Sequence, residues 1–230
     1  MAEQVILITG GSDGLGKIMA AQFAGDGHQV IILASNEAKL KLAATSLGVD
    51  YVAADIGNYE QVQAAVDQVQ KKYGRIDVLI NNAGVWVEGT IDECEVNKIR
   101  QAIEVNLLGL INVSKAVVPS MRENNFGLIV NINSDAGEEY KSGKTVYCAS
   151  KWGVTGFTKS LRRELESTGI RVTYVMPGRM RTNFFNKAGV DKDLQGALEP
   201  EYLARMVKYI VDLPAGVVVP SVRMESMATK

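Results

Sequence analysis

The sequence predicts a doubly wound α/β fold, in which helices cover both faces of one parallel sheet. Short, nearly continuous apolar segments rich in Val and Ile alternate along the chain with longer segments of helical periodicity. This pattern is typical of parallel strands that are buried on both faces. The chain has 230 residues, of which 47% are hydrophobic and 22% are charged. That length and composition are those of one globular domain.

The first half of the chain provides four strands separated by three helices. The predicted strands are residues 5–8, 30–33, 51–54 and 76–80. The helices between them have their apolar positions within residues 18–23, 40–47 and 62–69. Gly25 and Gly27 mark the end of the first helix, and Gly48 ends the second, since glycine readily adopts the conformation that terminates helices.

The second half continues the alternation and completes a seven-stranded sheet. Helices are predicted at residues 96–118, 145–166 and 201–211, and strands at 128–133, 172–176 and 217–219. No Pro/Ser-rich linker, repeat or charged block interrupts the chain, so residues 1–230 are expected to form a single domain. Residues 184–199 join the sixth strand to the last helix, and we expect them to form a substrate lid. Their short length indicates a small substrate.

Composition argues against several classes of function. With 25 basic and 26 acidic residues, the chain has no global charge to attract nucleic acid or an anionic membrane. His28 is the only histidine and no Cys-x-x-Cys occurs, so no metal site is expected and His-dependent hydrolases are disfavoured. The first apolar run is too short for a signal peptide, and no stretch reaches 18 apolar residues. A cytoplasmic protein is therefore expected.

A glycine-rich segment lies between the first strand and the first helix, where a dinucleotide pyrophosphate would meet free backbone N–H groups. Its spacing is Gly-x-x-x-Gly-x-Gly, which differs from the common Gly-x-Gly-x-x-Gly pattern. A tight turn between strand and helix can also need glycines without binding a ligand. The candidate phosphate-binding residues are Gly10, Ser12, Asp13, Gly14, Leu15 and Gly16.

The end of the second strand bears on the choice between the two nicotinamide cofactors. An acid there would bind a ribose 2′-hydroxyl, whereas an arginine would accommodate a 2′-phosphate. This chain has Ser35 and Asn36, with Lys39 nearby. These residues favour NADP(H) over NAD(H), although Asp13 would oppose the phosphate charge. Alternatively, Ser35 simply caps the following helix.

Tyr147 and Lys151 are four residues apart in a predicted helix and therefore share one face. The pair can also occur by chance on a surface. Here, however, Ser134 stands at the end of the fifth strand, at the edge where parallel sheets bind ligands. A neighbouring ammonium would lower the pKa of the tyrosine from its usual value near 10.

Further motifs follow the ends of the remaining strands. They are Asp55–Ile56, Asn81–Gly84, Asn106, Pro177–Gly178 and Thr182. With the glycine segment, Ser134, Tyr147 and Lys151, this ordered set resembles the classical short-chain dehydrogenase/reductase family over essentially the whole chain. The resemblance implies a Rossmann-like fold.

The resemblance also implies a role for each cofactor-binding motif. Asp55 and Ile56 would contact the adenine of the dinucleotide. The turn made by Asn82, Ala83 and Gly84 would pack on the adenosine side and stabilise the central sheet. Pro177, Gly178 and Thr182 would border the nicotinamide and its carboxamide.

Four residues would form the catalytic set of such an enzyme. The resemblance implies that Tyr147 is the general acid/base and that Lys151 holds the nicotinamide ribose while depressing the tyrosine pKa. Ser134 would hydrogen-bond the substrate oxygen. Asn106 would anchor a water molecule that leads protons to Lys151. Purely structural roles are the alternative: Asn106 could cap or bridge within a helix, and Ser134 could simply end a strand.

The expected activity is hydride transfer between a small alcohol or carbonyl substrate and the nicotinamide cofactor. A non-catalytic dinucleotide sensor or scaffold is the alternative from another class, and a lyase or epimerase is a third. Relatives associate through helices corresponding to residues 96–118 and 145–166, which implies a homotetramer or homodimer. The acidic residues 135–139 could favour a cationic or polyhydroxylated substrate, or form a solvated loop.

Overall fold

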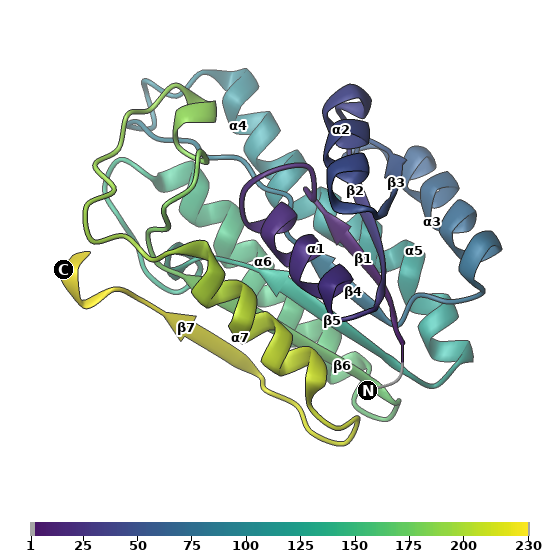
Figure 1. Cartoon of the computed structure of the whole chain (residues 1–230). Helices are drawn as coiled ribbons and strands as arrows, with labels where there is room; N and C mark the ends of the chain where they lie inside the picture. Colours follow the sequence, from purple (N-terminus) through teal and green to yellow (C-terminus); the bar gives the residue numbers. More distant parts are fainter. Residues whose placement is uncertain (1–2, 230) are drawn as a thin grey trace.

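Seven parallel strands form one sheet in the order β3-β2-β1-β4-β5-β6-β7 among residues 3–229, which the computed structural model describes (Figure 1). The predicted doubly wound, Rossmann-like fold is therefore confirmed. The strands are β1 (Val5–Thr9), β2 (Gln29–Ala34), β3 (Asp50–Ala53), β4 (Val78–Asn81), β5 (Gly127–Ile132), β6 (Ile170–Pro177) and β7 (Ser221–Met224). The order changes direction between β1 and β4, which is where such sheets bind ligands beyond their carboxyl ends.

Helices cover both faces of the sheet (Figure 1). One face carries α1 (Gly14–Gly25), α2 (Glu37–Leu47) and α7 (Pro200–Asp212). The other carries α3 (Tyr59–Tyr73), α5 (Leu110–Glu123) and α6 (Thr145–Glu164). Along β1, Leu7 packs into the second layer and Ile8 into the first, because successive side chains of a strand point to opposite faces. Two apolar layers thus hold the sheet rigid beneath the site.

The start of α2 corrects one reading of the sequence. Asn36, rather than Ser35, caps this helix, and its side-chain oxygen accepts a hydrogen bond from the Lys39 backbone N–H at 2.9 Å. An Asn side chain reaches the third residue of a helix in this way. Gly48 ends the helix as expected, with φ +67°. Ser35 is therefore free of the capping role.

The predicted helix at residues 96–118 consists of three parts. A π-helical turn, Glu104–Gly109, separates α4 (Val96–Ile103) from α5. Such turns widen a helix locally and re-aim its side chains. Among the described residues, Val96–Glu123 is the one helical stretch long and apolar enough to cross a membrane, and 50% of its apolar window is buried inside the fold.

The last strand lies further along the chain than predicted. The valines of residues 217–219 were expected to form it, but Val217 and Val218 are exposed and β7 begins after Pro220. β7 pairs with β6, with Ser221 opposite Tyr174 and Met224 opposite Pro177. The register of this pairing, rather than apolar content, places the strand, so the sequence pattern misplaced it by four residues.

Candidate active site

A cavity of about 670 Å³ opens at the carboxyl ends of the parallel strands. It extends from the glycine loop before α1 to the first turns of α6. Seventeen residues predicted from the sequence line it: Gly10, Ser12, Asp13, Gly14, Leu15, Ser35, Asp55, Ile56, Asn82, Ala83, Gly84, Ser134, Tyr147, Lys151, Pro177, Gly178 and Thr182. Gly16, Asn36 and Asn106 do not line it. One continuous space therefore joins the candidate phosphate-binding loop to the Tyr–Lys pair.

The glycine loop is held tightly against the turn that follows β4. Gly10 has φ +66°, and a Cβ atom there would lie 2.9 Å from Ala83 Cα. Asn82 donates a side-chain hydrogen bond to Thr9 O at 3.0 Å, and its backbone N–H donates to Thr9 Oγ1 at 3.0 Å. Glycine is required at Gly10 because both the positive φ and the close approach exclude a side chain. Asn82 and Ala83 thus shape the loop as well as line the cavity.

Asp13 occupies the centre of a charged cluster at the start of α1. Its carboxylate accepts hydrogen bonds from Gly14 N at 2.7 Å, Lys39 Nζ at 2.5 Å and Asn183 Nδ2 at 2.8 Å, and Lys187 Nζ lies 2.9 Å away. Partial burial raises the pKa of Asp13, but these hydrogen bonds outweigh it and hold that pKa well below its usual value. Two ammonium groups share one carboxylate, which leaves a positive surplus beside the helix N-terminus.

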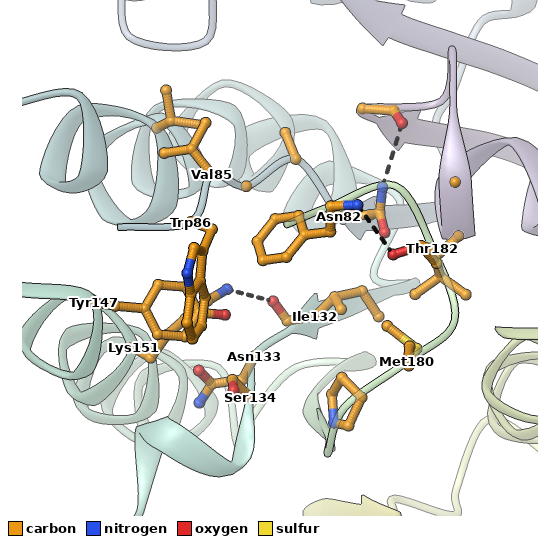
Figure 2. A pocket seen from close by; sticks show the side chains of 18 of the residues that line it. Asn82, Val85, Trp86, Ile132, Asn133, Ser134, Tyr147, Lys151, Met180 and Thr182 are labelled. Atoms are coloured by element: carbon orange, nitrogen blue, oxygen red, sulfur yellow. Dashed lines mark hydrogen bonds between the residues drawn. The ribbon is translucent and has the colours of Figure 1, made fainter. Parts of the chain in front are cut away.

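Tyr147 and Lys151 lie on one face of α6 at the other end of the cavity (Figure 2). Tyr147 is buried, and its ring centroid lies 4.5 Å from that of Trp86. Lys151 is also buried, and its Nζ donates a hydrogen bond to Ile132 O at 3.1 Å. The same Nζ lies 5.9 Å from the Tyr147 ring centroid. Phe184 and Phe185 join Trp86 and Tyr147 in one aromatic cluster.

The electrostatics of this pair differ from the sequence expectation. We expected Lys151 to lower the pKa of Tyr147. Instead, burial raises this pKa above its usual value, and a hydrogen bond with the Ser134 hydroxyl offsets part of the increase. Burial lowers the pKa of Lys151 to about 8. The reason is that both groups are removed from water, which disfavours their charged forms. The Tyr147 phenol therefore holds its proton at neutral pH.

Asn106 acts as a bridge between segments. Its Oδ1 accepts a hydrogen bond from Val85 N at 2.7 Å, and its Nδ2 donates to Val85 O at 3.0 Å and to Ser150 Oγ at 3.1 Å. Ser150 in turn donates to Tyr147 O at 2.7 Å. The π-helical turn brings Asn106 to this position. The side chain thus ties the segment after β4 to the first turns of α6.

Sequence reasoning missed several residues that line the cavity. Asn183 is separated from its partner Asp13 by 170 residues, and no sequence signal connects them. Lys144 stands one helical turn before Tyr147, so its spacing could have indicated it. Others without a sequence signal are Gln101, Lys187 and Arg223.

Comparisons with known proteins show the family of the chain. The model of the short chain dehydrogenase family matches residues 4–193. The chain belongs to this family. It is 32% identical to an uncharacterised oxidoreductase of Staphylococcus saprophyticus over 223 residues, which are 94% of each protein. The chain is therefore similar to an oxidoreductase over nearly its full length.

Two solved structures of dehydrogenases are similar to the chain over nearly its full length. The first is the closed form of a serine dehydrogenase complexed with NADP+, with a TM-score of 0.88, 30% identity and coverage of 96% and 94%. The second is an alcohol dehydrogenase from the archaeon Thermococcus sibiricus complexed with 5-hydroxy-NADP, with a TM-score of 0.91, 26% identity and coverage of 100% and 99%.

The cavity of this family member fits a phosphate-containing dinucleotide at the glycine loop. Gly14 has φ +48°, and a Cβ atom there would lie at ordinary van der Waals distance, 3.9 Å, from Thr182 and Asn183, so the positive φ rather than crowding favours glycine. The N-terminus of α1 and the lysines around Asp13 supply the positive partial and full charges that phosphate groups require. No group of three or more His, Cys, Asp or Glu side chains that could hold a metal occurs within residues 3–229.

Proposed function

We propose that the protein interconverts a small alcohol and its carbonyl compound by hydride transfer with a nicotinamide cofactor. The observation that carries this proposal is the single cavity that joins the glycine loop to Ser134, Tyr147 and Lys151. A phosphate-binding loop without catalytic groups would be sufficient for a non-catalytic dinucleotide sensor. A buried phenol and a buried ammonium beside a serine hydroxyl add the groups that proton transfer to a carbonyl oxygen needs.

We infer that the cofactor is NADP(H) rather than NAD(H). Gly10, Ser12, Gly14 and Leu15 would hold the pyrophosphate at the start of α1, while Asp55 and Ile56 would border the adenine. When bound, the nicotinamide ring donates or accepts the hydride. Ser35 lines the cavity at the end of β2, and Lys39 lies close by at Asp13. The NADP+ of the serine dehydrogenase and the 5-hydroxy-NADP of the alcohol dehydrogenase support the same choice.

The residues of the chain manage the proton and exclude water. Because burial keeps the Tyr147 phenol protonated, it can give its proton to the carbonyl oxygen as negative charge develops there. Lys151 would hold the nicotinamide ribose and support the phenolate that remains. Ser134 would orient the substrate oxygen. The aromatic cluster of Trp86, Phe184 and Phe185 would keep water from the reacting atoms.

The segment of residues 184–199 is proposed as the lid of this site. Phe185 of this segment packs on Trp86, and Lys192 forms an ion pair with Glu88 at 2.6 Å. Both contacts support a position of the segment over the substrate end of the cavity. Its short length supports a small substrate.

We propose that the enzyme is a cytoplasmic homotetramer or homodimer. The helices predicted to form the contact expose apolar side chains, namely Val96, Ile103, Leu108 and Trp152. The free thiols of Cys94 and Cys148 suit a reducing compartment. Light scattering at micromolar concentration tests the assembly. A monomer would contradict it.

The deciding experiment compares two tyrosine variants with a panel of small carbonyl compounds and NADPH. Tyr147→Phe should reduce turnover by about 100- to 10,000-fold, the range for loss of a general acid, while leaving NADPH affinity nearly unchanged. Tyr140→Phe is the matched control because Tyr140 is 92% exposed. If the wild-type protein binds NADPH but turns over no carbonyl or alcohol, the sensor alternative holds and the proposal fails.

A further inference from the structure

Lys144 lies at the substrate end of the cavity without an ionic partner. It precedes α6 by one residue, three positions before Tyr147. Its Nζ sits 5.3 Å from the centroid of the Trp86 ring. Among the described residues, its ammonium makes no hydrogen bond or ion pair. A half-buried ammonium of this kind is costly to hold unless a ligand compensates it.

The acids around this position are already neutralised. Asp135 pairs with Lys141, and Glu88 pairs with Lys192 at 2.6 Å. Glu139 pairs with Arg223. The acidic segment 135–139 therefore offers little charge to a cationic substrate, which was one reading of its sequence. Lys144, in contrast, has no carboxylate partner among the described residues.

The indole of Trp86 places this ammonium beside the reacting groups. Its Nε1 donates a hydrogen bond to Glu88 Oε2 at 3.1 Å, which fixes the ring. Tyr147 and Lys144 both contact this ring, at 4.5 Å between the two ring centroids and 5.3 Å from Nζ to the indole centroid. A carboxylate bound by Lys144 would thus lie beside the ring that Tyr147 also contacts.

We propose that Lys144 binds a carboxylate of the substrate, so that the protein acts on short hydroxy acids and oxo acids. This inference rests on the proposed function. One ammonium over an aromatic face matches one carboxylate attached to a short apolar chain. The pKa of Lys144 is lowered by burial and by the neighbouring Lys141 and Lys192, and a bound anion would relieve that cost.

Binding of an unreactive acid tests the inference without turnover. Butyrate and butyramide are titrated calorimetrically into the NADP+-loaded protein and its variants. The wild-type protein should prefer butyrate, and Lys144→Met should reduce that preference about 10- to 100-fold, as expected for loss of a hydrogen bond to a charged group. Lys144→Arg should keep it. Lys98→Met is the control, since Lys98 is exposed and pairs with Glu95 at 2.7 Å. Equal binding of the two probes, or an unchanged preference in Lys144→Met, overturns the inference.

Turnover separates this inference from the proposed function. With NADPH, 3-oxobutanoate should have a higher kcat/KM than its methyl ester, and the ratio should fall about 10- to 100-fold in Lys144→Met. If neither compound reacts but Lys144 still selects butyrate, the proposed function fails and the carboxylate site stands. If the ester reacts as well as the acid, the function stands and the carboxylate site is wrong.

Discussion

The hydroxyl group of Ser134 donates a hydrogen bond to Oδ1 of Asp135, at 2.9 Å. The same carboxylate oxygen accepts the Ala136 N–H at 2.7 Å, and Oδ2 binds Lys141. A hydroxyl group has a single proton, so Ser134 can donate it either to Asp135 or to Tyr147 and a bound substrate oxygen. Asp135 therefore controls which hydrogen bonds Ser134 offers to a substrate oxygen.

Replacing Asp135 by Asn should lower the pKa of Tyr147. Burial is the main cause of the raised pKa of the phenol, and the negative charge of Asp135 raises it further. Alcohol oxidation requires the deprotonated phenol as base, so its rate rises with pH through this pKa. In Asp135→Asn the midpoint of the pH profile of kcat for oxidation should move to lower pH.

Glu139→Gln is the matched control for this prediction. It also removes a negative charge from the cavity wall, but Glu139 does not contribute to the raised pKa of Tyr147. The profile of Glu139→Gln should therefore match that of the wild-type protein. A midpoint shift of equal size in both variants would show that the net charge of the cavity wall, not the Ser134–Asp135 contact, determines the midpoint of the pH profile.

The sequence predicted the fold and most of the cavity because both depend on local patterns. Strands buried on both faces have continuous apolar runs, and their carboxyl ends meet at one edge of a parallel sheet. Residues that follow different strands, such as Gly10, Asn82 and Ser134, therefore meet in one cavity. Spacing along one helix also placed Tyr147 and Lys151 on one face.

Features that depend on tertiary contacts escaped prediction. The pairing register with β6 decides where β7 lies, and the contact of Asn106 with Val85 accompanies the π-helical turn. The direction of the Tyr147 pKa shift is set mainly by burial, which the spacing of Tyr147 and Lys151 does not show. The four-partner cluster of Asp13 draws on residues far apart in the chain.

Two substitutions in the Asp13 cluster should change cofactor preference in opposite directions. Lys39→Ala removes an ammonium group near the end of β2 and should lower the ratio of NADP+ to NAD+ kcat/KM about tenfold, as for one hydrogen bond to a charged group. Asp13→Asn removes the carboxylate that holds Lys39 at 2.5 Å and should raise the ratio. Steady-state kinetics with both cofactors measures it.

Lys41→Ala serves as the control for cofactor preference. Lys41 is an exposed lysine of the same helix, two residues from Lys39, and does not line the cavity. Its removal changes the net charge equally, so the ratio should stay at the wild-type value. A ratio that falls in both lysine variants, or that falls in Asp13→Asn, would contradict the role given to Lys39.

Buried Lys151 should make the stability of the protein depend on pH. Its pKa is about 8 when folded and near 10.5 when unfolded, so the unfolded chain binds more protons between these values and stability rises with pH there. Below pH 8 the charged lysine costs about 3 kcal/mol. The difference in Tm between Lys151→Met and wild type should therefore shift in favour of wild type as the pH rises from 8 to 10.

Exposed Lys41→Met should show no such trend in thermal unfolding. Loss of the hydrogen bond from Lys151 to Ile132 O lowers the stability of Lys151→Met by a similar amount at each pH. The change of the Tm difference with pH therefore measures the effect of the buried charge, whereas a constant part of the difference reflects the lost hydrogen bond. A constant Tm difference would mean that Lys151 is equally protonated in both states.

Two glycines of α1 should respond to alanine in opposite ways. A Cβ atom at Gly16 would lie 2.4 Å from Gly10 O and 2.5 Å from Asn82 Nδ2, whereas a Cβ atom at Gly25 would meet nothing within 4 Å. Gly16→Ala should force the glycine loop away from the β4 turn, destabilise the protein by about 1–3 kcal/mol and weaken NADPH binding. Gly25→Ala should raise the free energy of unfolding by about 0.5–1 kcal/mol, because alanine loses less backbone entropy in a helix. Urea unfolding with NADPH titration measures both effects, and equal losses in the two variants would show that helix α1, rather than its contact with the loop, is the sensitive element.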